Sequence, residues 1–233
     1  MTKLKAMVKT AEHVEILEEN IAEELGSYSD ADVEMMKLIG LDPNRLIGVK
    51  HGDLFRQCIQ SLQSSIQEPF PSLNYEEIAS GLKSVFDKSC ISPAATVESA
   101  LGALYFGSEL LVPKMYGFIL QAFALHTSLS QNEYSFFELH VNMDKNHAAA
   151  MRQVVLASAT SKESRLKMVL AATAVMDARV EFLDQLVAAM HAAAPVHIST
   201  PVRSGSIGGN QHLLPPLSIT RKCKQVFAKS VVD

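Results

Sequence analysis

The chain has 233 residues, of which 48% are hydrophobic and 20% are charged. This length and composition fit one large globular domain with a substantial core. A formal net charge of −4 and a pI near 6.1 offer no basic surface, so a nucleic-acid partner is not expected. The 3 cysteines are odd in number and lack CxxC spacing, which excludes a disulfide framework and a thiolate zinc site.

Neither an export signal nor a membrane span is expected from the sequence. The apolar run of a signal peptide does not follow the N-terminal lysines, because glutamates crowd residues 12–19 instead. Charged side chains also interrupt residues 168–187, which are otherwise the most apolar long stretch. We therefore expect a soluble protein of the reducing cytoplasm, without a membrane partner.

Apolar residues recur at steps of three and four along the first part of the chain, which predicts amphipathic helices. The first predicted helix covers residues 6–25 and ends at Gly26. The second covers residues 31–39, starts from an N-cap in the turn before it, and ends at Gly40. Glycine suits both ends because it adopts the left-handed conformation that closes many helices.

The same period continues further along the chain, and no convincing run of strands interrupts it. Later helices are expected over residues 46–65, 75–88, 96–126, 130–156 and 165–190. Pro113 should kink the apolar helix that contains it. Beyond residue 191 the chain is rich in Gly, Ser and Pro without a helical period, which predicts a flexible tail over residues 192–233. The expected fold class is therefore all-α, with a helical domain over residues 1–191.

Three side chains that can bind metal recur at helical spacing within an apolar segment. At about 100° per residue, His140, Asp144 and His147 lie within about 60° of one another on one helix face. Two imidazoles and a carboxylate suit iron or manganese. Surface residues can produce the same short motif, so the rest of a site has to come from elsewhere in the chain.

Two glutamates are candidates for the remaining ligands of such a metal site. Glu109 shares an apolar helix face with Tyr105, and a carboxylate there is costly to desolvate unless it meets a cation or a metal. The alternative is a helix edge at which Glu109 reaches solvent or an arginine. At the end of the first helix, Glu24 continues the inner stripe from Ile21, whereas Glu23 falls on the side expected to be solvated.

Three blocks of sequence resemble the haem-oxygenase-like di-iron oxidases and oxygenases, a family of iron-containing redox enzymes. They are residues 20–26 (NIAEELG), 102–113 (GALYFGSELLVP) and 137–147 (FELHVNMDKNH), and the resemblance covers roughly residues 12–190. It implies a haem-oxygenase-like bundle, with a helical metal-binding domain over residues 1–191 that holds two iron(II) ions. Carried over position by position, the implied metal ligands are Glu24, Glu109, His140, Asp144 and His147.

One ligand of the family has no direct counterpart in this chain. The family has a histidine shortly after the first glutamate, but residues 27–34 contain none. Glu34 is the expected substitute, with Asp30 and Asp32 behind it, and His51 could serve only if the chain folds back. A carboxylate in that place would add negative charge, so we expect the second site to hold iron(II) or manganese weakly.

Family members usually have further helices ahead of the first glutamate helix, whereas this chain begins near that helix. Three alternatives follow: the bundle is incomplete, a partner subunit such as a second copy in a homodimer fills the gap, or the sequence comes from a truncated gene.

The resemblance implies an enzyme that uses iron to activate O2 and acts on a small amino acid, amine or fatty acid. The alternative is a non-catalytic helical interaction protein with a degenerate metal site, which the missing histidine favours. A cofactor-free hydrolase of the thiaminase-like branch of this fold fits less well, because no cysteine lies beside a suitable acid in the three blocks.

Overall fold

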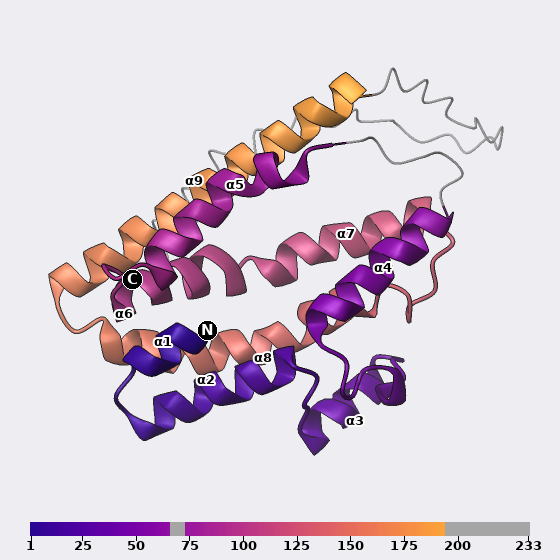
Figure 1. Cartoon of the computed structure of the whole chain (residues 1–233). Helices are drawn as coiled ribbons and strands as arrows, with labels where there is room; N and C mark the ends of the chain where they lie inside the picture. Colours follow the sequence, from indigo (N-terminus) through magenta and orange to yellow (C-terminus); the bar gives the residue numbers. More distant parts are fainter. Residues whose placement is uncertain (66–72, 194–233) are drawn as a thin grey trace, which may run out of the picture.

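A computed structural model describes residues 1–65 and 73–193, except for the side chains of residues 144, 145 and 193. Within these ranges the chain is helical and contains no strand, which confirms the all-α fold class (Figure 1). The α-helices are α1 (Thr2–Met7), α2 (Ala11–Glu24), α3 (Asp30–Leu38), α4 (His51–Ser65), α5 (Tyr75–Phe86), α6 (Val97–Leu101), α7 (Val112–His126), α8 (Ser135–Ser158) and α9 (Lys162–Ala193). The predicted tail, residues 192–233, lies almost entirely outside the described residues.

Three short segments have other helical forms. They are the 3-10 helix η1 (Pro43–Arg45) and the π-helices η2 (Asp87–Ile91) and η3 (Gly102–Glu109). Because η1 and a turn precede it, α4 begins at His51 rather than near residue 46 as predicted. His51 is thereby placed in the first turn of α4.

The predicted ends of the first two long helices are confirmed. Gly26 and Gly40 have φ angles of +86° and +85°, the left-handed conformation that glycine adopts without strain. Ser29 caps α3 by accepting a hydrogen bond from the Asp32 backbone N–H, and the Asp32 side chain accepts one from the Ser29 N–H in return.

Gly26 also brings two distant segments into contact. Its carbonyl accepts a 2.8 Å hydrogen bond from the Gly48 N–H, and a β-carbon at Gly26 would lie only 2.6 Å from the backbone nitrogen of Val49. No side chain larger than hydrogen fits there. The end of α2 therefore lies directly beside the turn that leads into α4.

The long apolar segment around Pro113 is broken rather than kinked. The π-helix η3 ends at Glu109, and α7 restarts at Val112 with Pro113 in its first turn. Proline lacks an N–H and so cannot continue the preceding helix, but it fits the first turn of a new one.

Two hydrophobic clusters fill the interior, and α8 belongs to both. The first joins α1 and α2 to η3, α9 and the C-terminal half of α8, and it includes Leu17, Leu101 and Met151. The second joins α3, α4 and α7 to the N-terminal half of α8, and it includes Phe123 and Phe136. The helix that carries the metal-ligand motif therefore runs from one cluster into the other.

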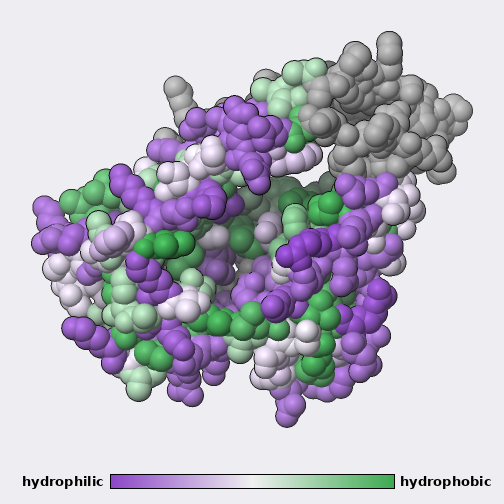
Figure 2. Space-filling model, viewed as in Figure 1, coloured by the Kyte–Doolittle hydropathy of each residue, from purple (hydrophilic) through white to green (hydrophobic). Residues whose placement is uncertain are grey.

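The space between the helices is not filled evenly. Helix α9 packs against α5, α6 and η3, whereas α7 packs against α8, so α7 and α9 diverge (Figure 1). In the same view, the surface is hollowed between α5 and α4, and hydrophobic side chains line part of the recess (Figure 2). Among the described helices, none is both long and apolar enough to cross a bilayer.

Candidate metal centre

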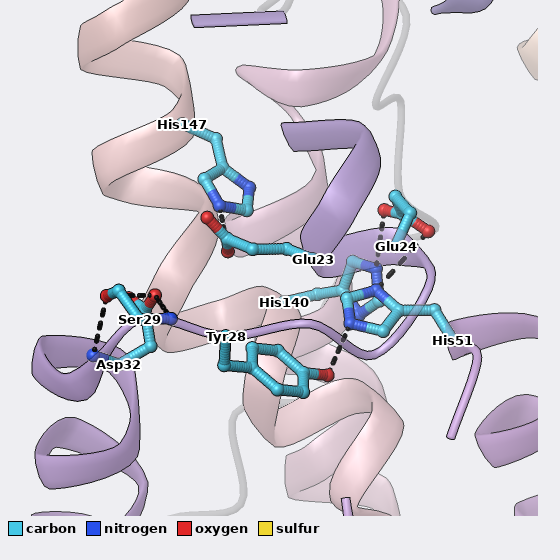
Figure 3. A network of polar contacts seen from close by, with 8 residues as sticks. All are labelled: Glu23, Glu24, Tyr28, Ser29, Asp32, His51, His140 and His147. Carbon is cyan, nitrogen blue, oxygen red and sulfur yellow. Dashed lines mark hydrogen bonds and ion pairs between the residues drawn. The ribbon is translucent and has the colours of Figure 1, made fainter. Parts of the chain in front are cut away.

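Glu24, His51 and His140 meet where α2, α4 and α8 come together (Figure 3). Nδ1 of His51 lies 3.3 Å from Oε2 of Glu24, and Nε2 of His140 lies 3.8 Å from Oε1. Ligand atoms of the three residues all lie within 4.8 Å of one another. An ion with bonds of about 2.1 Å holds its ligands about 3 to 4 Å apart, so a small closure would complete three bonds.

The outer nitrogen of each imidazole is held by a neighbouring group. Nδ1–H of His140 donates a 2.6 Å hydrogen bond to the Phe136 carbonyl, which leaves the lone pair of Nε2 on the side of Glu24. Nε2 of His51 lies 2.8 Å from the hydroxyl of Tyr28. When Nε2–H donates to the Tyr28 oxygen, the lone pair of Nδ1 points towards Glu24. Such outer partners commonly fix metal-binding histidines.

Nδ1 of His51 provides the test of whether a metal fits here. This atom is sealed from solvent and has no hydrogen-bond partner, although a carboxylate oxygen lies 3.3 Å away. A buried imidazole nitrogen without a partner is costly, whereas a metal ion at that point would use its lone pair. Nitrogen, nitrogen and carboxylate oxygen are a donor set that iron(II) accepts.

The electrostatics of the cluster keep the Glu24 carboxyl charged. Burial by itself raises its pKa, but the close contacts with His140 and His51, which favour the carboxylate whenever these imidazoles carry a proton, outweigh burial and hold the pKa well below its ordinary value. Burial, followed by the negative charges of Glu23 and Glu24, raises the pKa of the Tyr28 hydroxyl. Tyr28 therefore keeps its proton, while Glu24 is an anion.

Aromatic rings lie close to the His140 imidazole. Its ring lies 4.2 Å from the ring of Phe136 and 5.6 Å from that of Tyr116, measured between centroids, and 4.8 Å from the His51 ring. The two imidazoles are almost fully buried, but the Glu24 side chain is 51% exposed. The cluster is therefore buried at its histidines and open to solvent at Glu24.

Glu23 and His147 form a second acid–imidazole pair on the same two helices. Oε2 of Glu23 is in direct contact with Nε2 of His147, and the side chains are only 13% and 11% exposed. The prediction that Glu23 is solvated was therefore wrong, because the adjacent glutamates straddle the contact line between α2 and α8 and both meet histidines of α8 (Figure 3).

A hollow of about 480 Å³ opens beside this second pair. Polar side chains from α2, α3, α8 and the turn between α2 and α3 make up most of its lining, and these include Asn20, Glu23, Tyr28, Asp32 and His147. Tyr28 lines the hollow and also contacts His51, so a single side chain separates the hollow from the Glu24 cluster.

The structure does not bring Glu34 to either group. Its side chain is 71% exposed on α3 and forms a 2.6 Å ion pair with Lys37. The place expected for Glu34 beside Glu24 is taken by His51, because the contact between Gly26 and Gly48 folds the chain back. The backbone geometry of these glycines is the feature that the sequence alone did not reveal.

The other predicted ligands lie close to α8. Glu109 ends η3 and borders a separate hollow of about 430 Å³, together with Lys114, Ala148 and Arg152. It is not among the three residues whose ligand atoms lie within 4.8 Å of one another. Asp144 lies on α8 between the two histidines, and its side chain is outside the described part of the chain.

Comparison with known proteins provides independent support for a metal centre. Residues 4–180 match the sequence model of a protein family described as iron-containing redox enzymes. None of the curated proteins matches the chain.

Proposed function

Because the chain belongs to the haem-oxygenase-like family of iron-containing redox enzymes, we propose that Glu24, His51 and His140 hold the iron of an O2-activating oxidase or oxygenase. Its expected substrates are a small amino acid, amine or fatty acid. The family match covers most of the chain and is the basis for the iron-dependent redox function. The number of ions, the ligands and the substrate are parts of the proposal.

The observation that carries the proposed ligand set is the buried Nδ1 of His51. It has no hydrogen-bond partner, and the carboxylate of Glu24 and the imidazole of His140 lie beside it. A protonated histidine paired with Glu24 would be expected to form a hydrogen bond at that atom. The arrangement instead fits a metal ion bound by one nitrogen of each imidazole and by one oxygen of Glu24.

Iron bound at this position would supply the electrons and the open coordination sites that O2 chemistry requires. The protein residues have separate tasks. Phe136 and Tyr28 orient the two imidazoles, and the aromatic rings keep water away from their inner side. Glu24 supplies negative charge and, being half-exposed, leaves one side of the ion open to small molecules.

A second ion is proposed at the contact of Glu23 with His147. Asp144 precedes His147 by three residues on the same helix, so the two share a face, and Glu109 reaches the neighbouring turn of α8. These four residues offer one imidazole and three carboxylates. Such an oxygen-rich set would favour iron(II) or manganese held more weakly than at the Glu24 cluster.

Metal retention tests this proposal directly. Full-length protein is loaded with iron(II) without oxygen, desalted and analysed for metal. We expect His51→Ala and His140→Ala to lose one ion per chain, whereas His126→Ala, which removes an exposed histidine at the end of α7, keeps the wild-type content. Oxygen-dependent absorbance should appear only in proteins that retain the ion.

His147→Ala and Glu109→Ala test the second position separately. Loss of a second, weaker ion in both variants would support two sites, and an unchanged metal content in both would contradict the second site. If the wild-type protein retains no more iron than His51→Ala, the enzyme proposal fails. The non-catalytic helical interaction protein would then be the better description.

A further inference from the structure

Arg179 is a cation without a matching anion on the inner side of α9. Its Nη2 donates a 3.1 Å hydrogen bond to the Gly107 carbonyl at the end of η3. Its Nε is sealed from solvent and has no hydrogen-bond partner. Among the ion pairs that the described residues form, none includes Arg179.

Such a guanidinium is unusual because arginine is seldom buried without a carboxylate. Burial lowers the pKa of Arg179, and the nearby Tyr116 only partly opposes this effect. The group remains charged because its ordinary pKa is far above neutral. The protein therefore bears the desolvation cost of a cation whose Nε–H has no acceptor among residues 1–65 and 73–193 as described.

Arg179 lies where two helices part. One turn earlier, Val175 packs tightly against η3, since a β-carbon at Gly107 would lie 2.8 Å from its Cγ1. Beyond Arg179, η3 has ended and α7 diverges from α9 (Figure 1). Leu183 and Val187 continue the stripe at steps of four, and their side chains are exposed. The cation is thus followed by two exposed apolar side chains on α9.

Arg179 also lies close to the proposed metal centre. Tyr116 influences the guanidinium electrostatically, and its ring centroid lies 5.6 Å from that of His140. One aromatic side chain is therefore close both to the guanidinium and to a proposed iron ligand.

We propose that Arg179 binds the carboxylate of a small organic acid whose apolar body lies along Leu183 and Val187. This inference rests on the proposed function, because it narrows the substrate class of the same centre to molecules that bear a carboxylate. Guanidinium and carboxylate groups match in charge and in planar geometry. When the ligand displaces the atoms that cover Nε, Nε–H and one N–H of Nη2 can form two parallel hydrogen bonds to it. The second N–H of Nη2 can keep the bond to the Gly107 carbonyl.

The test uses metal-free, full-length protein, so that a carboxylate cannot bind through iron. Hexanoate, hexylamine and hexan-1-ol are titrated by calorimetry, because they share one apolar chain and differ in the head group. We expect the wild-type protein to bind hexanoate in preference to the other two. Arg179→Gln can still donate to the Gly107 carbonyl but has no charge, and it should weaken hexanoate binding by roughly tenfold or more.

Arg165→Gln is the matched control. Arg165 is also on α9 and also donates to a backbone carbonyl, at 3.0 Å from that of Ala159, but it is exposed. Its replacement should leave hexanoate binding unchanged. Equal hexanoate affinity in wild type and Arg179→Gln would overturn the proposal, as would equal binding of the three probes.

A second measurement does not depend on the folding of a variant. Wild-type protein is treated with phenylglyoxal, which modifies arginine, and each modified peptide is measured by mass spectrometry. Hexanoate should slow the modification of Arg179 and not that of Arg165, and equal rates with and without hexanoate would contradict the proposal. Iron retention, measured on the same preparations, separates this inference from the proposed function. If the wild-type protein keeps iron but does not bind hexanoate, only the inference about Arg179 is refuted. If it binds hexanoate but does not keep iron, only the iron proposal is refuted.

Discussion

The two ends of α8 are packed by different kinds of side chain. Its C-terminal half contacts aliphatic residues and the glycine-bearing helix η3, within the cluster that includes Leu101, Met151 and Val175. Its N-terminal half is surrounded by aromatic rings, among them Phe123 and Phe136, and both buried imidazoles of the metal centre touch this second cluster. The first cluster therefore holds helices together closely, whereas the second also orients the ligands. Variants that damage one cluster and spare the other can separate these two roles.

Gly102→Ala should have the largest effect, and it acts on the first cluster. A β-carbon at this position would overlap the Met168 backbone, which cannot move without shifting α9. We expect the free energy of unfolding to fall by about 3 kcal/mol. Urea unfolding followed by circular dichroism measures this loss. Gly81→Ala, where the new methyl group meets nothing within 4 Å, should be neutral or slightly stabilising, and equal behaviour of the two variants would contradict the explanation.

Tyr28→Phe should affect the metal centre and spare the fold. The ring of Tyr28 stacks on His51 at a centroid distance of 6.1 Å, and phenylalanine keeps this contact but loses the hydroxyl that holds Nε2. We expect iron affinity to fall about tenfold with little change in unfolding. Competition with a chelator of known affinity measures it. Tyr75→Phe, at an exposed position on α5, is the control, and an unchanged affinity in Tyr28→Phe would rule out this role.

Cys58 makes the second cluster sensitive to alkaline pH. Burial, with a smaller contribution from Glu133, raises the pKa of its thiol from 9.0 to about 11. Between these values the unfolded chain has lost the proton and the folded chain has kept it, so stability falls as pH rises through this window. We expect a steeper loss between pH 9 and pH 11 in wild type than in Cys58→Ala, measured by urea unfolding. Parallel slopes in the two proteins would contradict the assignment.

Glu34→Gln should have the smallest effect of these changes. The residue is exposed and paired only with Lys37 one turn away, an arrangement that contributes a few tenths of a kcal/mol. We expect iron content equal to that of the wild type, determined by metal analysis after anaerobic loading. A loss of iron comparable to that of His51→Ala would show instead that Glu34 is a metal ligand. It would also contradict the position of α3 described above.

The contrast between Glu34 and His51 shows how far the sequence can define such a site. Helical period identifies which residues share a face, and the face that joins His140 to His147 could be predicted in this way. The helical period does not reveal which other helices pack against that face. His51 follows Glu24 by 27 residues (51 − 24) and reaches it only through the backbone contact of Gly26 with Gly48. The prediction that Glu23 is solvated was wrong for a related reason. Helix α8 contacts α2 on both sides of the stripe that includes Glu24, so Glu23 meets His147.

The sequence by itself determined the all-α class, the glycine ends of α2 and α3, the shared face of α8 and the choice of Glu24 as a candidate partner of His140. Each of these depends on neighbours within a few residues, where propensity and period act. The tertiary structure alone decided that His51 completes the Glu24 cluster, that Glu23 meets His147 and that Nε of the partly buried Arg179 meets no acceptor in the described part of the chain. These are contacts between helices far apart in the chain, and close packing at a few glycines sets which side chains meet.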